Sequence, residues 1–211
     1  MGPALAWAAV CCHRLYLVGP NADPEADRRK ATEFARRALE VARDDPGILA
    51  NAAFALGFFG EDIGAMTALV DRALALNPSY ARAWHLSGNL RVYAGQTEIA
   101  IEHLETALRL SPRARVGSSL GLIGRAHFFS RRFDEAVPKL LAIQEDPSHP
   151  SAYRDLAACY AHMGRLDDAR EIVERLRAIT PVVIPDASFL RNPEHRELIL
   201  SGLRLAAGEA E

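Results

Sequence analysis

The sequence predicts an all-α fold, a right-handed α-solenoid of about five helix–turn–helix repeats with a capping helix at its C-terminal end. Three observations indicate this fold class. Two similar segments, Ala73–Pro78 and Ala107–Pro112, end in prolines that lie 34 residues apart. Small residues recur at the positions where paired helices must approach each other closely. No stretch alternates apolar and polar residues with a period of two, so we expect essentially no sheet.

The third repeat, residues 81–114, shows the pattern most clearly. Its key positions hold an aromatic residue, a glycine, two alanines, a leucine and a proline that ends the second helix: Trp84, Gly88, Ala100, Ala107, Leu104 and Pro112. A 34-residue helix–turn–helix unit with these residue types resembles the tetratricopeptide repeat. The resemblance implies stacked hairpins that bury a continuous core and leave a concave groove.

The same skeleton, in more degenerate form, predicts a single superhelix over residues 1–211. The five repeats are expected at about residues 4–43, 47–80, 81–114, 117–149 and 150–183. The register of the second repeat stays open by one residue, since an extra residue near Gly60 would place Ala53, rather than Phe54, at the small position. Asn192 followed by Pro193 predicts the start of the capping helix, over about residues 193–206. The apolar segment before it, residues 182–185, is expected to lie along the last hairpin.

Composition limits the class of partner. Lys+Arg 25 against Asp+Glu 27 gives a net charge of −2, which argues against a nucleic-acid or anionic-membrane binder, because such affinity comes from surplus positive charge. The apolar run Pro3–Cys12 is too short to span a bilayer and lacks the basic stretch and cleavage site of a signal peptide. Cys11, Cys12 and Cys159 form neither a disulfide framework nor a zinc-binding spacing. We therefore expect a cytoplasmic protein with no metal, cofactor, membrane or nucleic-acid partner.

One motif raises the question of catalysis. Gly117–Gly121 matches G-x-S-x-G, the nucleophile elbow of hydrolases. That motif works on a strained strand-to-helix turn, and no strand is expected between Pro112 and the fourth hairpin. The seven histidines are scattered, and the sequence contains no P-loop and no H-E-x-x-H motif. We therefore expect a protein that is not an enzyme and has no catalytic residues.

The concave surface remains as the candidate site. In tetratricopeptide repeats the first helix of each hairpin lines the groove at fixed repeat positions, and these positions carry over to the third, fourth and fifth repeats. The candidate partner-binding residues are Arg82, His85, Asn89, Tyr93, Arg125, Phe129, Arg154 and His162. Arginine suits carboxylates and aromatic rings supply contact area, so an acidic or carboxylate-bearing peptide is the expected ligand. The alternative is that some of these side chains, Phe129 above all, pack between hairpins.

A closer resemblance covers nearly the whole chain. Its segments are residues 77–84, 87–88, 100–103, 107–112, 126–129 and 191–204. Together they resemble the C-terminal repeat region of bacterial class III adenylate cyclase-like proteins and of related winged-helix regulators. The cyclase catalytic domain, with its metal-binding aspartates, is not within these 211 residues. The resemblance therefore implies a sensory or docking arm of a bacterial signalling protein, without cyclase activity.

The function that the sequence favours is a non-catalytic protein–protein interaction module that binds a partner protein or peptide in its groove. Two alternatives stay open. The first hairpin, with Trp7 and Phe34 and no preceding cap, would also suit self-association, as in a homodimer. The arginines and histidines of the groove would also suit a small ligand, as in a sensor arm.

Overall fold

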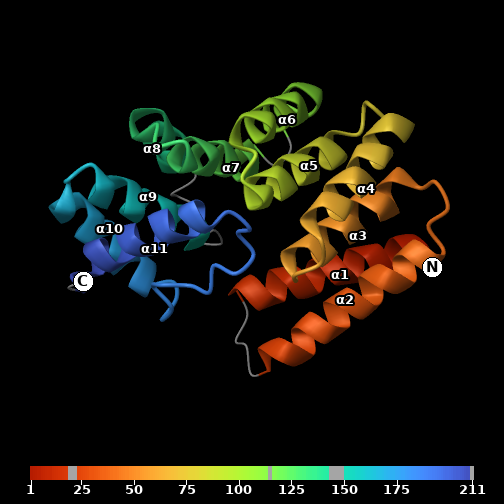
Figure 1. The fold of residues 1–211 in the computed structure, drawn as a ribbon, viewed down its shortest axis with the longest axis horizontal. Helices are drawn as coiled ribbons and strands as arrows, with labels where there is room; N and C mark the ends of the chain where they lie inside the picture. The colour runs from red at the N-terminus through yellow and green to blue at the C-terminus, as the bar shows by residue number, and fades with distance from the viewer. Residues whose placement is uncertain (19–22, 114–115, 143–149, 210–211) are drawn as a thin grey trace.

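A computed structural model describes residues 1–18, 23–113, 116–142 and 150–209 (Figure 1). These residues form eleven α-helices and contain no β-strand, so the all-α prediction is confirmed. The helices are α1 (Gly2–Val18), α2 (Pro24–Glu40), α3 (Pro46–Phe58), α4 (Ile63–Leu76), α5 (Ala81–Ala94), α6 (Thr97–Leu110), α7 (Val116–Phe129), α8 (Phe133–Leu141), α9 (Pro150–His162), α10 (Leu166–Arg177) and α11 (Pro193–Ala207).

The first ten helices pair consecutively into five hairpins, from α1 with α2 to α9 with α10. The first helix of each hairpin also packs against the first helix of the next one, so α1, α3, α5, α7 and α9 form one continuous inner layer. Figure 1 shows the hairpins following an arc, with α11 on its inner side. This arrangement is the α-solenoid that the repeat period predicts.

Close approach within the hairpins explains the recurring small residues. A Cβ atom at Gly88 would lie 2.5 Å from Leu104 Cγ and 3.1 Å from the backbone oxygen of Ala100. The next hairpin repeats the contact, since a Cβ atom at Gly124 would lie 2.8 Å from Leu140 Cγ. A larger residue at either glycine would therefore separate the two helices of its hairpin.

Short polar side chains and tight turns determine where the helices begin and end. Asp45 and Asp62 accept hydrogen bonds from backbone N–H groups in the first turns of α3 and α4, as N-cap residues do. Gly95 adopts a φ of 83° between α5 and α6, in the left-handed region that favours glycine. The start of α4 lies 17 residues after that of α3, whereas α6 starts 16 residues after α5. The extra residue belongs to the turn around Gly60, which is the alternative register considered for the second repeat.

The C-terminal region caps the solenoid in two parts. Helix α11 packs on α9 and α10 and buries Leu198, Ile199 and Leu203, in agreement with the predicted capping helix. Residues 178–192, which we call the strap, join α10 to α11 without regular secondary structure. Residues 182–185, which are expected to lie along the last hairpin, are joined to it by hydrogen bonds from Arg154 of α9 to the oxygens of Val182 and Val183. The second half of the strap crosses to the C-terminal ends of α3 and α5.

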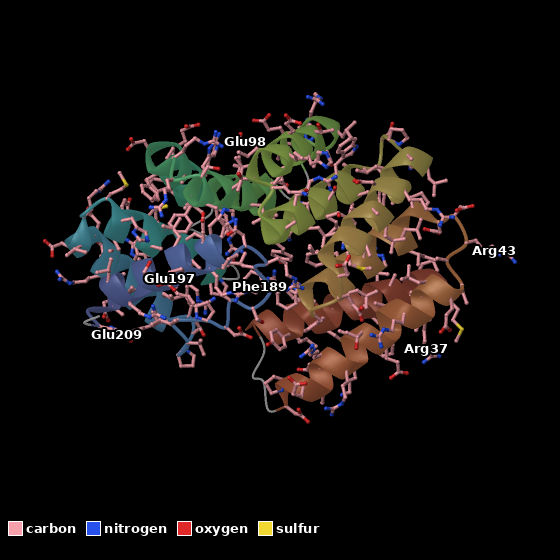
Figure 2. The ribbon with its side chains drawn as sticks, viewed as in Figure 1. Arg37, Arg43, Glu98, Phe189, Glu197 and Glu209 are labelled. Carbon is pink, nitrogen blue, oxygen red and sulfur yellow. The ribbon has the colours of Figure 1, made fainter. Side chains whose placement is uncertain are left out.

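The position of the Phe189 side chain also shows that the strap crosses the molecule (Figure 2). Figure 2 places Phe189 of the strap near the middle of the molecule, whereas Arg37, Arg43, Glu98 and Glu209 lie at its periphery. Within the described part of the chain, no helix is both long enough and apolar enough to cross a membrane.

Candidate functional site

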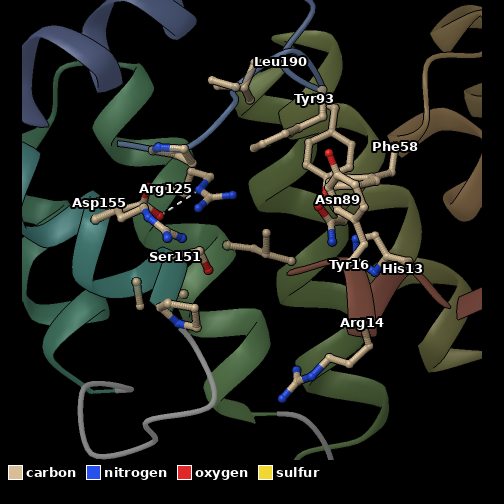
Figure 3. A pocket seen from close by; sticks show the side chains of 18 of the residues that line it. His13, Arg14, Tyr16, Phe58, Asn89, Tyr93, Arg125, Ser151, Asp155 and Leu190 are labelled. Atoms are coloured by element: carbon tan, nitrogen blue, oxygen red, sulfur yellow. Dashed lines mark hydrogen bonds and ion pairs between the residues drawn. The ribbon is translucent and has the colours of Figure 1, made fainter. Parts of the chain in front are cut away.

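The concave face encloses a cavity of about 1090 Å³ (Figure 3). The first helix of every hairpin contributes to its lining, and the strap forms the remaining wall with residues between 179 and 190. The site is therefore built from all five hairpins. Its floor consists of mutually packed helices, and one of its walls consists of chain without regular secondary structure.

Seven of the eight residues predicted for the groove line this one cavity. They are Arg82, His85, Asn89, Tyr93, Arg125, Phe129 and Arg154. The eighth, His162, does not line it. Its Nε2 atom lies 2.8 Å from the backbone oxygen of Leu198 on α11, and its ring stacks on Phe133 at a centroid distance of 5.8 Å. The expectation that His162 faces the groove is therefore wrong, because the capping helix covers that end of α9.

An ion pair between α7 and α9 forms one side of the cavity. Arg125 Nε donates a hydrogen bond of 2.7 Å to Asp155 Oδ2, and both side chains are buried, with 12% and 4% of their surface exposed. Burial raises the pKa of the Asp155 carboxyl even though Arg125 opposes the shift by its charge and its hydrogen bond. Asp155 Oδ1 has no hydrogen-bond partner among the residues that the structure describes. Figure 3 shows the Arg125 guanidinium pointing across the cavity toward Asn89 and Tyr93.

The other two predicted arginines are engaged within the protein. Arg82 Nε donates to Asn51 Oδ1 over 2.8 Å, and the Arg82 guanidinium lies 4.1 Å from the centre of the Trp7 ring. Arg82 therefore ties the first three hairpins together by a hydrogen bond and a cation–π contact. Arg154 donates to two backbone oxygens of the strap, from Nε to Val183 over 3.1 Å and from Nη2 to Val182 over 2.6 Å.

Aromatic side chains form the opposite side of the cavity. The Phe58 ring lies 4.3 Å from His13, 6.0 Å from Tyr93 and 5.3 Å from Phe189 of the strap, measured between ring centres. Burial raises the pKa of Tyr93 to about 12, so its hydroxyl stays protonated. Burial, together with the charge of Arg14, lowers the pKa of His13 to about 3, so its ring is neutral near pH 7. This side therefore offers apolar surface with neutral polar groups.

The cavity carries an excess of positive charge although the chain as a whole has a net charge of −2. Its charged lining residues among those described are Arg14, Arg82, Arg125, Arg154, Asp155 and Asp186. Arginine thus outnumbers aspartate in a concave and partly buried site, where electrostatic attraction is stronger than in water. The site is suited to an anionic group.

The G-x-S-x-G segment lies inside α7 and forms no strand-to-helix turn. Its Ser119 Oγ lies 2.9 Å from His85 Nδ1, and both residues are buried. Ser119 does not line the cavity. The contact therefore joins the third hairpin to the fourth. Within the described ranges, no three His, Cys, Asp or Glu side chains are grouped so that they could hold a metal ion.

Several lining residues lie outside the predicted set. His13 and Tyr16 of α1 and Phe58 of α3 belong to the two degenerate repeats, where the repeat positions could not be assigned. Phe189 and Leu190 belong to the strap, which has no period. Asp155 was within reach of sequence reasoning, because it follows Arg154 on the helix expected to face the groove.

Two parts of the sequence match the profiles of known repeats. Residues 81–113 and residues 130–187 each match the profile described as "Tetratricopeptide repeat". These two parts of the chain carry tetratricopeptide repeats. None of the curated proteins matches it in sequence.

Solved structures of tetratricopeptide repeat proteins have the same fold. TTC0263, a thermophilic TPR protein in Thermus thermophilus, is 21% identical with a TM-score of 0.65, over 93% of this chain and 97% of that one. YrrB, described as a TPR protein with an unusual peptide-binding site, is 25% identical with a TM-score of 0.54, over 84% of this chain and 93% of that one. MamA from Desulfovibrio magneticus RS-1 is 17% identical with a TM-score of 0.57, over 82% of this chain and 94% of that one. Tetratricopeptide repeats generally serve as non-catalytic modules of protein–protein interaction.

Proposed function

We propose that this chain binds an acidic peptide segment of a partner protein, with a carboxylate of the peptide held at Arg125 in the concave cavity. The observation that carries the proposal is the placement of the Arg125 guanidinium. Its Nε bonds to Asp155, and its remaining nitrogens point across the cavity (Figure 3). A guanidinium that is held in one orientation can donate two parallel hydrogen bonds to a carboxylate.

The surroundings of Arg125 support this ligand. The excess of arginine attracts negative charge, and the aromatic side formed by Phe58, Tyr93 and Phe189 offers contact surface to an apolar side chain. The helices hold these groups before the ligand arrives, so little conformational entropy is lost when it binds. A volume of about 1090 Å³ suits a segment of a few residues. The strap forms one wall of this cavity.

Two further properties belong to the proposal. The resemblance to the repeat region of adenylate cyclase-like proteins favours a docking role in bacterial signalling. The three cysteines carry no disulfide, which fits a reducing cytoplasm. The description of YrrB, a structural relative with a peptide-binding site, agrees with a peptide as the ligand.

Fluorescence anisotropy tests the peptide site. The probe is a fluorescein-labelled pentapeptide of glutamate and phenylalanine with a free C-terminal carboxylate, compared with an amidated peptide in which glutamine replaces glutamate. Arg125→Lys keeps a positive charge beside Asp155 but loses the planar fork, so we expect about tenfold weaker binding of the acidic peptide. Arg170→Lys is the matched control, because Arg170 lies on α10, outside the cavity lining. Equal affinity of both peptides, or no effect of Arg125→Lys, would contradict the proposal.

A small acid is the second candidate ligand, and the volume of the cavity favours it. Cavities of several hundred to about 1,000 Å³ are typical of small-molecule sites. A series of small carboxylic acids and their amides would distinguish this function in thermal melts without any peptide. If the acids raise the melting temperature and the acidic peptide does not bind, the chain is a sensor of small carboxylates.

Self-association is the third candidate, favoured by apolar side chains exposed on α1. Trp7 and Leu15 have 44% and 54% of their surface exposed. A homodimer through this helix would give a molar mass that rises with concentration in light scattering, and Leu15→Glu should abolish the rise. A constant monomer mass over the concentration range would exclude this alternative.

A further inference from the structure

The two halves of the strap are attached to the helices very differently. In residues 187–192, Ala187 and Leu190 are buried and Phe189 packs between Phe58 and Tyr93. The backbone N–H of Arg191 donates to the Tyr93 oxygen over 2.8 Å. This half is an anchor that joins directly to the start of α11.

No residue of 181–186 is fully buried, although Val183 and Ile184 pack against the core while partly buried. Val182 has 50% of its surface exposed, and Pro181 and Asp186 are exposed as well. Arg154 joins this half to the helices with two hydrogen bonds, which it donates to the oxygens of Val182 and Val183. Since Val182 and Asp186 also line the cavity, the hydrogen bonds of Arg154 attach this wall to α9, beside the partly buried packing of Val183 and Ile184 on the core.

Within the part of the chain that the structure describes, Arg154 donates its hydrogen bonds to the strap and forms no ion pair with a carboxylate of its own. Asp155, the aspartate beside it, is hydrogen-bonded to Arg125, and the two guanidinium groups share that single negative charge. Burial, and then repulsion by Arg125, lower the pKa of Arg154 to about 10. Its present acceptors are neutral carbonyl oxygens. Hydrogen bonds from arginine to a carboxylate are roughly twice as strong as those between neutral groups.

We propose that Arg154 is a latch, which holds residues 181–186 over the cavity and releases them when a carboxylate in the cavity takes its guanidinium. The proposal rests on the carboxylate site described above and adds its regulation. Binding of the acid and opening of this wall then favour each other, because a single side chain serves both states. The anchored half stays in place, so the opening is confined to the mouth of the cavity beside α9.

Thiol labelling measures the opening. Cys11 and Cys12 are replaced by serine, and Ile184→Cys, at a half-buried position of the segment, is the reporter. Cys159 stays silent, because it is buried and burial raises the pKa of its thiol. We expect Arg154→Gln to raise the labelling rate of the reporter by about tenfold or more, since two hydrogen bonds are lost. Val182→Cys, at an exposed position, gives the rate of a fully accessible thiol.

The ligand arm uses succinate, with succinamide at the same ionic strength as its neutral counterpart. Succinate should raise the labelling rate of the reporter in the chain that retains Arg154 and leave the rate unchanged in the Arg154→Gln variant. The acidic pentapeptide replaces succinate in a parallel series, which distinguishes a peptide from a small acid as the source of the carboxylate. Arg177→Gln is the matched control, because Arg177 lies on α10 next to the strap and pairs with Glu174. Far-UV circular dichroism verifies that each variant is folded.

Each outcome decides the proposal. An unchanged labelling rate in Arg154→Gln would show that Arg154 does not hold the segment, and the latch would be wrong. If succinate or the peptide binds in a separate titration but leaves the labelling rate unchanged, the latch is wrong and the carboxylate site stands. If Arg154→Gln opens the segment but no carboxylate binds, the proposed function fails, and regulation by a carboxylate fails with it.

Discussion

Arg191 and Gly57 are 134 residues apart in the sequence, yet Arg191 Nη2 donates a hydrogen bond of 2.7 Å to the Gly57 carbonyl oxygen. The backbone N–H of Arg191 also bonds to the oxygen of Tyr93. Both acceptors lie in the last turns of helices, α3 and α5, where the helix dipole favours a cation. In most solenoids each repeat contacts only its neighbours. Here the strap additionally connects the C-terminal cap to the second and third hairpins.

Phe189→Ala tests this connection. The ring packs against Phe58 and Tyr93 but is only partly buried. We therefore expect the free energy of unfolding to fall by roughly 2 kcal/mol, below the ~3–5 kcal/mol typical of a fully buried ring. Urea unfolding at equilibrium measures the loss. Val182→Ala, at an exposed position of the same strap, is the control and should change stability by less than about 0.5 kcal/mol. Equal losses in the two variants would show that Phe189 does not connect the hairpins.

The hairpins were predictable because their contacts repeat. Gly88 and Leu104 are close in sequence and occupy positions that recur with the period of the repeat, so a local pattern records their contact. Arg191 and Gly57 belong to no such pattern. The strap contains apolar residues, but without a period the sequence does not indicate which distant helix ends they contact.

The cavity was predictable to a similar extent. The regular third repeat placed Arg82, His85, Asn89 and Tyr93 on one inner surface. What the sequence could not predict is how the arginines are engaged. Repeat positions give the face of a helix, whereas the pairing of Arg125 with Asp155 and the bonds from Arg154 to the strap depend on the distance between helices and on a segment without regular structure.

Gly88→Ala tests the register of the third hairpin. Replacing an exposed helical glycine by alanine ordinarily stabilises a helix by about 0.5–1 kcal/mol. At Gly88 the added Cβ would lie 2.5 Å from Leu104 Cγ. We therefore expect a loss of about 1–3 kcal/mol in the free energy of unfolding, measured with urea. Leu104→Ala removes the clash, so the double variant should lose less than the sum of the two single variants. A stabilising Gly88→Ala would show that the helices are farther apart.

Arg125→Met tests the ion pair. Removing the guanidinium leaves Asp155 buried without its partner, so we expect a loss of roughly 3–5 kcal/mol in the free energy of unfolding. Arg125→Met combined with Asp155→Leu removes both charges and should recover most of the loss. Arg132→Met is the control, because its ion pair with Glu98 is more exposed and contributes about 0–1 kcal/mol. If the double variant is as unstable as the single one, the arginine stabilises the fold by packing and the charge of Asp155 is irrelevant.

The lowered pKa of His13 predicts how the free energy of unfolding depends on pH. Burial among Phe54, Phe58 and Phe59, and to a lesser extent the charge of Arg14, lower the pKa of its ring to about 3 in the folded protein. In the unfolded chain the ring titrates near its ordinary pKa of about 6.5, so below that pH the unfolded state binds a proton that the folded state does not. The contribution of the neutral His13 ring to the free energy of unfolding is therefore retained above about pH 6.5 and is lost as the pH falls toward 3.

His13→Phe measures this contribution. The substitution removes the titrating group and keeps an aromatic ring against Phe58. Between pH 6.5 and pH 4.5 the unmodified chain should lose about 2 kcal/mol more of its free energy of unfolding than the variant loses. The same pair above pH 7.5 is the control, where the difference in stability should no longer depend on pH. Parallel losses of both chains below pH 6.5 would mean that the His13 ring accepts a proton in the folded state, so that the aromatic side of the cavity admits water.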